Sequence, residues 1–294
     1  MRAGLVALIL AAAAAPAPAA PRVELAGRFV WERPERYFGG WSGIEVADGG
    51  QTFFAIGDNA QTCDCRFTRD AAGRITGIPR KPIGALTDTD GVALFRKHAP
   101  GLTDSEGLAR LPDGSYAVSF EKVPRVLLYP PGGGPPVRLP DMPGITALPP
   151  NQMVEALAAD AKGRLLAIPE VRPPGDAGFP VWRLEGAAWK ELWQIATSDG
   201  FHPTGADVGP DGKLYLLERD YWLNQFRSRI RVFDPEAPDP QGVTLWQSGY
   251  GAFDNLEGIS VWRDRAGGTR ITMISDDNYK WYQRTEIIEL ALTG

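Results

Sequence analysis

This sequence of 294 residues predicts an all-β protein, a single closed β-propeller of four-stranded blades. Three observations favour that fold. One hairpin-like segment recurs five times, turn residues separate two apolar runs in each copy, and the 34 glycines and 26 prolines are spread along the chain. Turn residues spread in this way are typical of many short antiparallel strands. A repeat of about 40–50 residues has the size of one propeller blade.

The five copies align on one small residue each, at intervals of 64, 49, 49 and 53 residues. The aligned residues are Gly43, Gly107, Ala156, Gly205 and Gly258. After each comes a turn such as PDG or AGG, and then an apolar run: TFFAIGD, SYAVSFE, RLLAIPE, KLYLLER and RITMISD, in that order. Short apolar runs around such turns predict hairpin strands. Helical repeats would instead place apolar residues three and four apart.

Two outer strands should complete each blade, as RSRIRVFDP and TEIIELAL indicate. The stretch RVELAGRFVWE is expected to pair with TEIIELAL in the last blade, which would close the ring. Five blades is the predicted number. A sixth blade, the alternative, needs a degenerate copy inside the first interval, where DTDGVALFRKHAPGL is more typical of an excursion between blades.

Residues 1–20 have the pattern of a secretory signal peptide, with Arg2, the apolar run GLVALILAAAAA and the small residues APAPAA. The apolar run is shorter than the roughly 20 residues that a membrane-spanning helix needs, so we expect cleavage rather than an uncleaved anchor. The sequence therefore predicts a propeller domain over residues 21–294 in a periplasmic or secreted protein, with no integral membrane span after cleavage.

Several functions are disfavoured. Without Arg2 the chain has 30 basic and 36 acidic residues and no basic tail, so no nucleic-acid partner is expected. It has no Gly-x-Ser-x-Gly elbow, no phosphate-binding glycine-rich loop, and only two histidines, which argues against a Ser-His-Asp triad. Cys63 and Cys65 are compatible with either a strained bridge or two buried thiols.

Two columns of polar residues recur with the repeat. The residues before the aligned small residues are Ser42, Glu106, Glu155, Thr204 and Glu257. The residues that end the second strands are Asp58, Glu121, Glu170, Glu218 and Asp276. Antiparallel pairing places both columns at the same rim of a blade. Because the first strand lines the channel of a propeller, we expect these carboxylates, with Asp207 and Asp277 nearby, to crowd one channel mouth.

So many like charges require either a bound cation or bound protons. Carboxylate and amide oxygens suit Ca²⁺, or alternatively Mg²⁺, rather than Zn²⁺. The predicted metal ligands are Asp58, Glu121, Glu170, Asp207, Glu218, Asp276 and Asp277. The alternative is that these acids cap strand ends and accept loop N–H groups. Turn chemistry alone does not require an acid at the end of all five second strands, so the column favours a site.

Cations and amides in the same loops predict contacts to an anionic substrate. Arg219 and Arg284 could hold a phosphate ester beside a divalent ion, or each could form a structural ion pair. Further candidates for substrate binding are Lys122, Arg229, Asn151, Asn278 and Gln283.

These motifs resemble the phytase-like family, also described as "esterase-like activity of phytase", over almost the whole mature chain. The strongest match is ISDDNYKWYQRTEII, and MVEALA, DSEGLA and GADVGPDGKLYLLERDY resemble other family segments. The resemblance implies an exported bacterial β-propeller, with a phosphoesterase activity suggested from a recurring polar set. In this chain the set is Asp58, Glu106, Glu121, Glu155, Glu170, Asp207, Glu218, Glu257, Asp276, Asp277, Arg219 and Arg284. One departure is Asn59 in IGDNA, where the family usually has Arg in Ser-Asp-Arg-Gly.

The leading hypothesis is an exported hydrolase, a divalent-metal-dependent phosphoesterase acting on a small phosphate ester. Its predicted catalytic residues are Glu106, Glu155, Glu257, Arg219 and Arg284. The alternatives are a metal-dependent lactonase or carboxylesterase propeller, and a non-catalytic periplasmic ligand-binding propeller. Carboxylates that converge near an arginine favour the first, a small Glu/Asn/Asp cluster without arginine favours the second, and dispersed acids favour the third.

Overall fold

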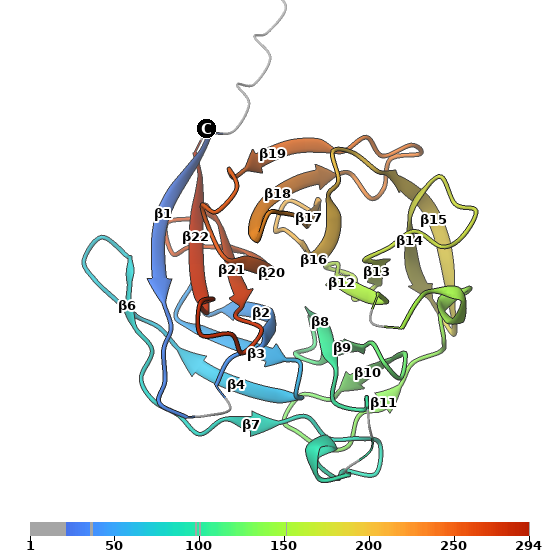
Figure 1. Ribbon diagram of the computed structural model, residues 1–294, viewed down its shortest axis with the longest axis horizontal. Helices are drawn as coiled ribbons and strands as arrows, with labels where there is room; N and C mark the ends of the chain where they lie inside the picture. Colours follow the sequence, from blue (N-terminus) through green and yellow to red (C-terminus); the bar gives the residue numbers. More distant parts are fainter. Residues whose placement is uncertain (1–21, 36–37, 98, 100, 151, 294) are drawn as a thin grey trace, which may run out of the picture.

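The computed structural model describes residues 22–35, 38–97, 99, 101–150 and 152–293. These residues form five four-stranded antiparallel sheets arranged as a ring, which is a five-bladed β-propeller (Figure 1). The predicted fold class is therefore confirmed, and the six-bladed alternative is wrong. The leader proposed for residues 1–20 lies outside the described residues. The described part of the chain contains no helix with the length and apolar character that crossing a bilayer requires.

Each blade places its first strand innermost and continues outward in chain order in blades 1 to 4. Blade 1 consists of β2 (Trp41–Ala47), β3 (Thr52–Gly57), β4 (Gln61–Arg66) and β7 (Gly84–Ala85). Blade 2 consists of β8 (Ser105–Arg110), β9 (Tyr116–Phe120), β10 (Arg125–Tyr129) and β11 (Val137–Arg138). Blade 3 consists of β12 (Val154–Ala159), β13 (Leu165–Pro169), β14 (Gly178–Glu185) and β15 (Ala188–Ala196). Blade 4 consists of β16 (His202–Val208), β17 (Leu214–Trp222), β18 (Gln225–Phe233) and β19 (Val243–Gln247).

The fifth blade joins the two ends of the chain. It consists of β20 (Asn255–Arg263), β21 (Thr269–Asp276), β22 (Glu286–Thr293) and, outermost, β1 (Arg22–Val30). Strand β1 pairs antiparallel with β22 from Arg22 opposite Thr293 to Val30 opposite Glu286, and Figure 1 shows the blue first strand beside the red last one. The predicted closure of the ring is confirmed.

The long first interval holds an excursion and not a blade. After β4 the chain forms a small separate hairpin, β5 (Thr68–Arg69) with β6 (Ile75–Gly77), and then returns to blade 1 as the two-residue edge strand β7. The 3₁₀ turns η1 (Leu94–Lys97) and η2 (Ile145–Ala147) lie in the connections before blades 2 and 3.

The aligned small residues mark where the five inner strands approach one another. The inner strands contact each other in the order β2, β8, β12, β16, β20 and back to β2. A Cβ atom added at Gly107 would lie 2.6 Å from the Glu155 carbonyl oxygen, and one at Gly43 would lie 2.7 Å from Leu108 Cβ. Real Cβ atoms do not approach so closely, so these two positions require glycine.

Apolar and aromatic side chains fill the space between neighbouring blades. Between blades 5 and 1, for example, the rings of Trp31 and Trp41 stack with centroids 5.0 Å apart, and Phe53 stacks on Phe67 at 4.3 Å. Cys63 and Cys65 belong to this cluster, and both are buried and bonded to each other within β4. Such packing of large rings holds the blades at a fixed angle and so fixes the channel mouth.

Candidate functional site

A β-bulge interrupts the inner hairpin of every blade at the same level. The extra residue is Ser42 in β2, Glu155 in β12, Thr204 in β16 and Glu257 in β20, each between two regular pairs of the ladder. In blade 2 the residues Glu106 and Gly107 together face the single residue Ser119. A bulge takes a residue out of the alternation of the strand and re-aims its side chain. The first polar column of the sequence is thus this ring of bulges.

The second column lies at the same end of the blades, just after the strand that returns from the far end. Asp58, Glu121 and Glu170 each follow directly on the second strand of their blade, and each donates its backbone N–H to a carbonyl of the chain leading into the first strand. Asp276 ends β21 and pairs with Asn255 at the start of β20. The predicted common rim of the two columns is what the structure shows for these residues.

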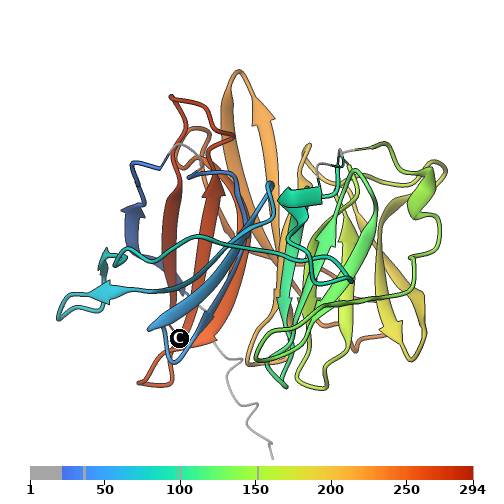
Figure 2. The same ribbon diagram turned by 90° about the horizontal axis from the view of Figure 1, so that it is seen from below.

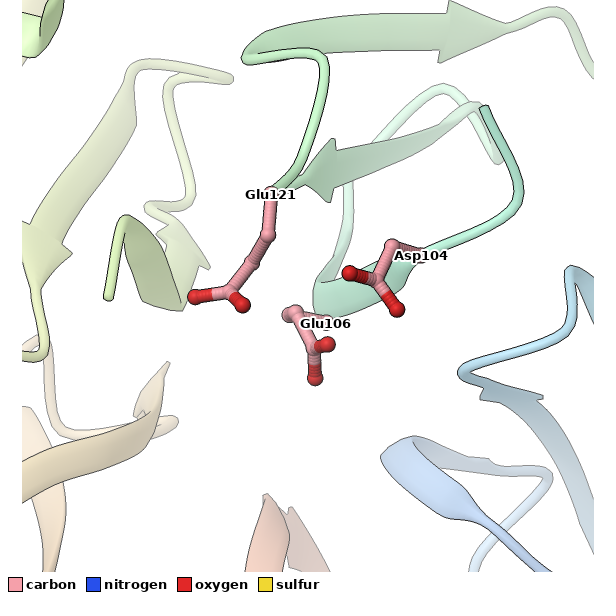
Figure 3. A group of neighbouring side chains, drawn as sticks. All are labelled: Asp104, Glu106 and Glu121. Carbon is pink, nitrogen blue, oxygen red and sulfur yellow. The ribbon is translucent and has the colours of Figure 1, made fainter. Parts of the chain in front are cut away.

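Three carboxylates of blade 2 converge most closely. One oxygen from each of Asp104, Glu106 and Glu121 lies within 4.8 Å of the others, and the three side chains point into the open centre of the ring (Figure 3). Glu121 Oε1 also accepts a hydrogen bond of 2.8 Å from Met153 N, and Lys122 Nζ lies 3.0 Å from Asp104 Oδ2. An oxygen-only set of three carboxylates has the donor chemistry that Ca²⁺ and Mg²⁺ take.

Burial is the main cause that raises the pKa values of the acids around this group. The pKa is raised to about 6 for Asp58, about 7 for Glu121 and Glu257, and about 9 for Asp276. For Asp276 the repulsion of Glu257 and Asp58 adds to the effect of burial. Without a cation, Asp276 therefore keeps its proton at neutral pH and Glu121 and Glu257 keep theirs in part, whereas isolated carboxylates would be ionised.

Glu106 and Glu155 show how far the repulsion extends across blades. Burial raises the pKa of both carboxyls well above its usual range. The pKa of Glu106 is raised further by the charges of Asp58, Glu155, Glu257 and Glu121. Acids of blades 1, 2, 3 and 5 therefore lie close enough to repel one another. The Oε2 atom of Glu155 is buried and has no hydrogen-bond partner among the described residues. A water molecule, an ion or a substrate group is needed to satisfy that atom.

One guanidinium stands among these acids. Arg219, in β17, donates from Nη1 to Glu257 Oε1 at 2.5 Å and to Asn255 Oδ1 at 2.6 Å, and from Nη2 to Glu170 Oε1 at 3.1 Å. Asn255 Nδ2 in turn donates to Glu257 at 2.8 Å. The side chain of Arg219 is only 17% exposed, so its position is fixed by blades 3 and 5 together. The Arg219 charge also lowers the pKa of Glu155, against the larger effect of burial.

A pocket of about 500 Å³ adjoins Arg219 between blades 4 and 5. The predicted substrate-binding residues Asn278, Gln283 and Arg284 line it, together with Arg219 itself. Asn278, Gln283 and Arg284 come from the loop between β21 and β22. The opposite wall of the pocket is the long β17–β18 hairpin, drawn in orange, which extends beyond the other blades in Figure 2.

The structure does not bring Glu218 and Arg229 to the mouth. Glu218 is completely buried inside blade 4, where its carboxylate accepts hydrogen bonds from Arg229 at 2.9 Å and Arg231 at 2.6 Å. Arg229 is 3% exposed and lies over the ring of Phe201. The prediction that Glu218 crowds the mouth with the other acids is therefore wrong. On the regular strand β17 its side chain points to the opposite side from its neighbour Arg219.

Asp207 also lies elsewhere, at the opposite end of the channel. Asp207 is three residues beyond the bulge of β16, and it lines a small pocket together with Glu45. The charge of Asp207 adds to the effect of burial in raising the pKa of Glu45. Asp207 Oδ2 accepts a hydrogen bond of 2.6 Å from Val261 N of blade 5. Asp277 stays near the mouth but holds the loop of Gly40, whose N–H it accepts at 3.0 Å. Asn151 lies outside the described residues.

Sequence reasoning missed Asp104 as a member of the acidic group. Its signal was the spacing Asp-x-Glu at the start of the second unit, because residues two apart on an extended chain point to the same side. The departure at Asn59 has a structural counterpart: its Nδ2 donates to the hydroxyl of Tyr279 at 2.7 Å. A neutral contact therefore stands where the family usually carries a cation.

Comparison with known proteins gives one match over most of the chain. The family model named Phytase-like, described as "Esterase-like activity of phytase", matches residues 36–279. Among curated proteins none matches.

Solved propeller structures are similar only at a distance. A gluconolactonase from Xanthomonas campestris has 15% identity and a TM-score of 0.49, covering 85% of this chain and 72% of its own. An aldose sugar dehydrogenase from Streptomyces coelicolor has 15% identity and a TM-score of 0.47, covering 94% and 100%. Virginiamycin B lyase from Staphylococcus aureus has 12% identity and a TM-score of 0.47, covering 92% and 99%. None of these similarities bears on the chemistry of the mouth.

Proposed function

The chain belongs to the phytase-like family, and on that premise we propose that this esterase-like propeller is a divalent-metal-dependent phosphoesterase acting on a small phosphate ester. The observation that carries the proposal is the pairing of opposite charges at one mouth. The group Asp104, Glu106 and Glu121 lies on the side of blade 2, and Arg219 stands on the side of blade 4. A phosphoryl group needs both a cation-binding acid set and fixed positive donors.

The three acids of blade 2 fit a hard divalent cation, because they offer oxygen ligands only and their atoms lie close together. We propose Ca²⁺, or alternatively Mg²⁺. Asp58 and Glu155 are the further acids whose charges raise the pKa of Glu106 most. When bound, such an ion supplies Lewis acidity toward a phosphoryl oxygen and lowers the pKa of a water molecule.

The chain's own residues provide the remaining parts of a hydrolysis. Arg219 is held by three acceptors, so it presents fixed charge to the equatorial oxygens of a phosphoryl group without reorganising. In its ionised form Glu155, which has one unsatisfied buried oxygen, would accept a proton from the attacking water. Glu257, with a pKa of about 7, can donate a proton to the departing alcohol oxygen. The bond from water oxygen to phosphorus then forms as the ester oxygen leaves.

We also propose that the protein works in the periplasm or as a secreted protein. The support for that location is the leader-like pattern of residues 1–20.

The deciding experiment is a substrate panel on the purified mature chain. 4-Nitrophenyl phosphate, 4-nitrophenyl butyrate and a γ-lactone are each assayed with EDTA and after addition of Ca²⁺ or Mg²⁺. We expect hydrolysis of the phosphate ester only, abolished by EDTA and restored by the ion. Glu106→Gln should lose that activity, whereas Glu24→Gln, exposed on the outermost strand β1, should keep it. Hydrolysis of the lactone or the butyrate alone, or full activity in EDTA, would overturn the proposal.

A further inference from the structure

The pocket beside Arg219 is lined by an unusual number of amide side chains. The whole sequence has 5 asparagines and 8 glutamines. Five of these thirteen amides line this one pocket: Asn224, Gln225, Asn255, Asn278 and Gln283. They come from two different blades, from the tip of the β17–β18 hairpin, the start of β20 and the loop before β22. The pocket therefore gathers, from distant parts of the chain, groups that both donate and accept hydrogen bonds.

Most of these amides keep capacity for a ligand. Asn255 is occupied by Arg219 and Glu257, and Gln283 Nε2 donates to Asp254 at 3.0 Å. Asn224 Oδ1 accepts from the Tyr221 hydroxyl at 2.7 Å, which leaves its amide nitrogen for other partners. Gln225 and Asn278 are exposed to the solvent of the pocket.

Aromatic rings form two facing walls of the same pocket. Tyr221 packs against Phe226 with ring centroids 4.8 Å apart on the hairpin side, and both rings line the pocket. Tyr282 lines it from the β21–β22 loop and is 61% exposed, while Tyr221 is 56% exposed. A globular protein ordinarily does not leave several large rings in water around one concavity without a ligand to cover them.

We propose that this pocket binds a saccharide ring, which is the alcohol part of the ester that the adjoining centre cleaves. A hydroxyl group both donates and accepts, as a side-chain amide does, so a ring with several neighbouring hydroxyls matches an amide-rich lining. The C–H faces of such a ring pack on tyrosine and phenylalanine rings. A volume of about 500 Å³ accommodates one or two sugar rings, within the usual range for ligand pockets of about 300–1,000 Å³.

The assignment of the ring as the alcohol part rests on the proposed function, whereas the binding of a saccharide does not. Arg219 and Asn255 belong both to the mouth and to the pocket, so a ring in the pocket places its ester oxygen beside Arg219. Lys280 and Arg284, which are exposed in the lining of the pocket, add positive charge there and so favour an anionic ester over a neutral one. A purely anionic ligand would use these cations and the amide nitrogens, but it would leave the amide oxygens and the aromatic walls without partners.

The test measures binding first and catalysis second. Saturation-transfer NMR is recorded on the mature chain with a panel of free neutral sugars: glucose, galactose, mannose, N-acetylglucosamine, ribose and maltose, with cyclohexanol as the apolar ring control. We expect transfer to at least one sugar and none to cyclohexanol. Tyr282→Ala and Gln225→Ala should each weaken the sugar's Kd at least about tenfold, which is 1.4 kcal/mol.

Matched controls separate the pocket from the surface around it. Phe95→Ala removes a ring that is 51% exposed and does not line the pocket, and Gln241→Ala removes an exposed amide in another loop. Both variants should bind the sugar like the wild type. The Glu155→Gln variant should also bind the sugar, even if it hydrolyses no ester. Failure of the proposed reaction and failure of the proposed sugar site therefore give different results. Absence of transfer to every sugar, equal binding of cyclohexanol, or unchanged binding by Tyr282→Ala and Gln225→Ala would overturn the inference.

Discussion

Replacing Arg219 by methionine tests whether this guanidinium compensates the acids of the mouth. The substitution keeps an unbranched apolar stem and removes the charged guanidinium, so Glu170 and Glu257, which are 15% and 11% exposed, lose their counter-charge. Removing one partner of a largely buried pair costs about 3–5 kcal/mol of folding free energy. For a chain of this size each kcal/mol shifts Tm by about 2–4 °C, so we expect Tm at pH 8 to fall by roughly 6–20 °C.

The same variant has a predicted pH dependence with a definite sign. Burial has already raised the pKa of Glu257 to about 7 with Arg219 present, and loss of the cation raises it further. A carboxyl whose folded pKa exceeds its unfolded value binds extra protons in the folded state, so stability falls as pH rises through that interval. The deficit of Arg219→Met should therefore be large at pH 8 and much smaller at pH 5. Thermal unfolding in EDTA at both values measures it.

A second substitution provides the control for this reasoning. In Arg219→Met/Glu257→Gln one of the two uncompensated acids is neutral, and we expect about half of the lost Tm at pH 8 to return. Arg66→Met, on the exposed side of β4, should change Tm little at either pH. An equal deficit for Arg219→Met at pH 5 and pH 8, or a double variant less stable than the single one, contradicts the view that Arg219 acts through the acids.

Three further predictions concern the mouth and its ligands. In EDTA the wild-type Tm should fall from pH 5 to pH 9, because the stability associated with the raised pKa of Asp276, about 9, is lost as that group ionises. Millimolar Ca²⁺ should flatten this dependence of Tm on pH. The same dependence with and without Ca²⁺ would contradict the proposed cation site. Glu155→Gln should reduce kcat for 4-nitrophenyl phosphate at least about a hundredfold with Tm in EDTA unchanged or higher, since one repelling acid is gone; wild-type kcat contradicts its role. Arg284→Lys keeps the positive charge but loses the planar guanidinium group. It should therefore raise KM for the phosphate ester and leave the Ca²⁺ concentration for half-maximal activity unchanged. A changed Ca²⁺ requirement with a normal KM would instead indicate that Arg284 acts at the ion.

The ring was predictable because its signals are local. Each hairpin is written in a turn such as Pro-Asp-Gly next to a short apolar run, and the aligned glycine is required by the approach of the next inner strand. Closure followed from pairing two strands left without partners at the ends of the chain, and β1 with β22 confirms it. None of these steps needed the orientation of a side chain within a blade.

The composition of the mouth was less predictable because it depends on such orientations. Glu218 has the same place in the repeat as Glu121, yet it ends buried against Arg229 and Arg231. Its strand β17 continues to Trp222, whereas β9 ends at Phe120 and the chain turns at Glu121. A residue in a continuing strand keeps the alternation of that strand, while one in a turn is free to face the channel. The length of a hairpin beyond its repeat is set by tertiary contacts.

The asymmetry of the mouth follows mainly from this difference in blade 4, and blade 1 also departs from the repeat with Ser42 at its bulge. A strict repeat would place two acids from each blade around the channel, a ring of like charge with no direction. Blade 4 instead has Thr204 at its bulge and turns Glu218 away, so the next residue, Arg219, enters the mouth. Blade 2 contributes three acids at the other side. The result is an uneven mouth, with Arg219 on the side of blade 4 and three converging acids on the side of blade 2. Under the proposed function, the charged end and the neutral end of an ester meet different surroundings there, and we expect the longer hairpin that builds the pocket wall to set the orientation of the ester.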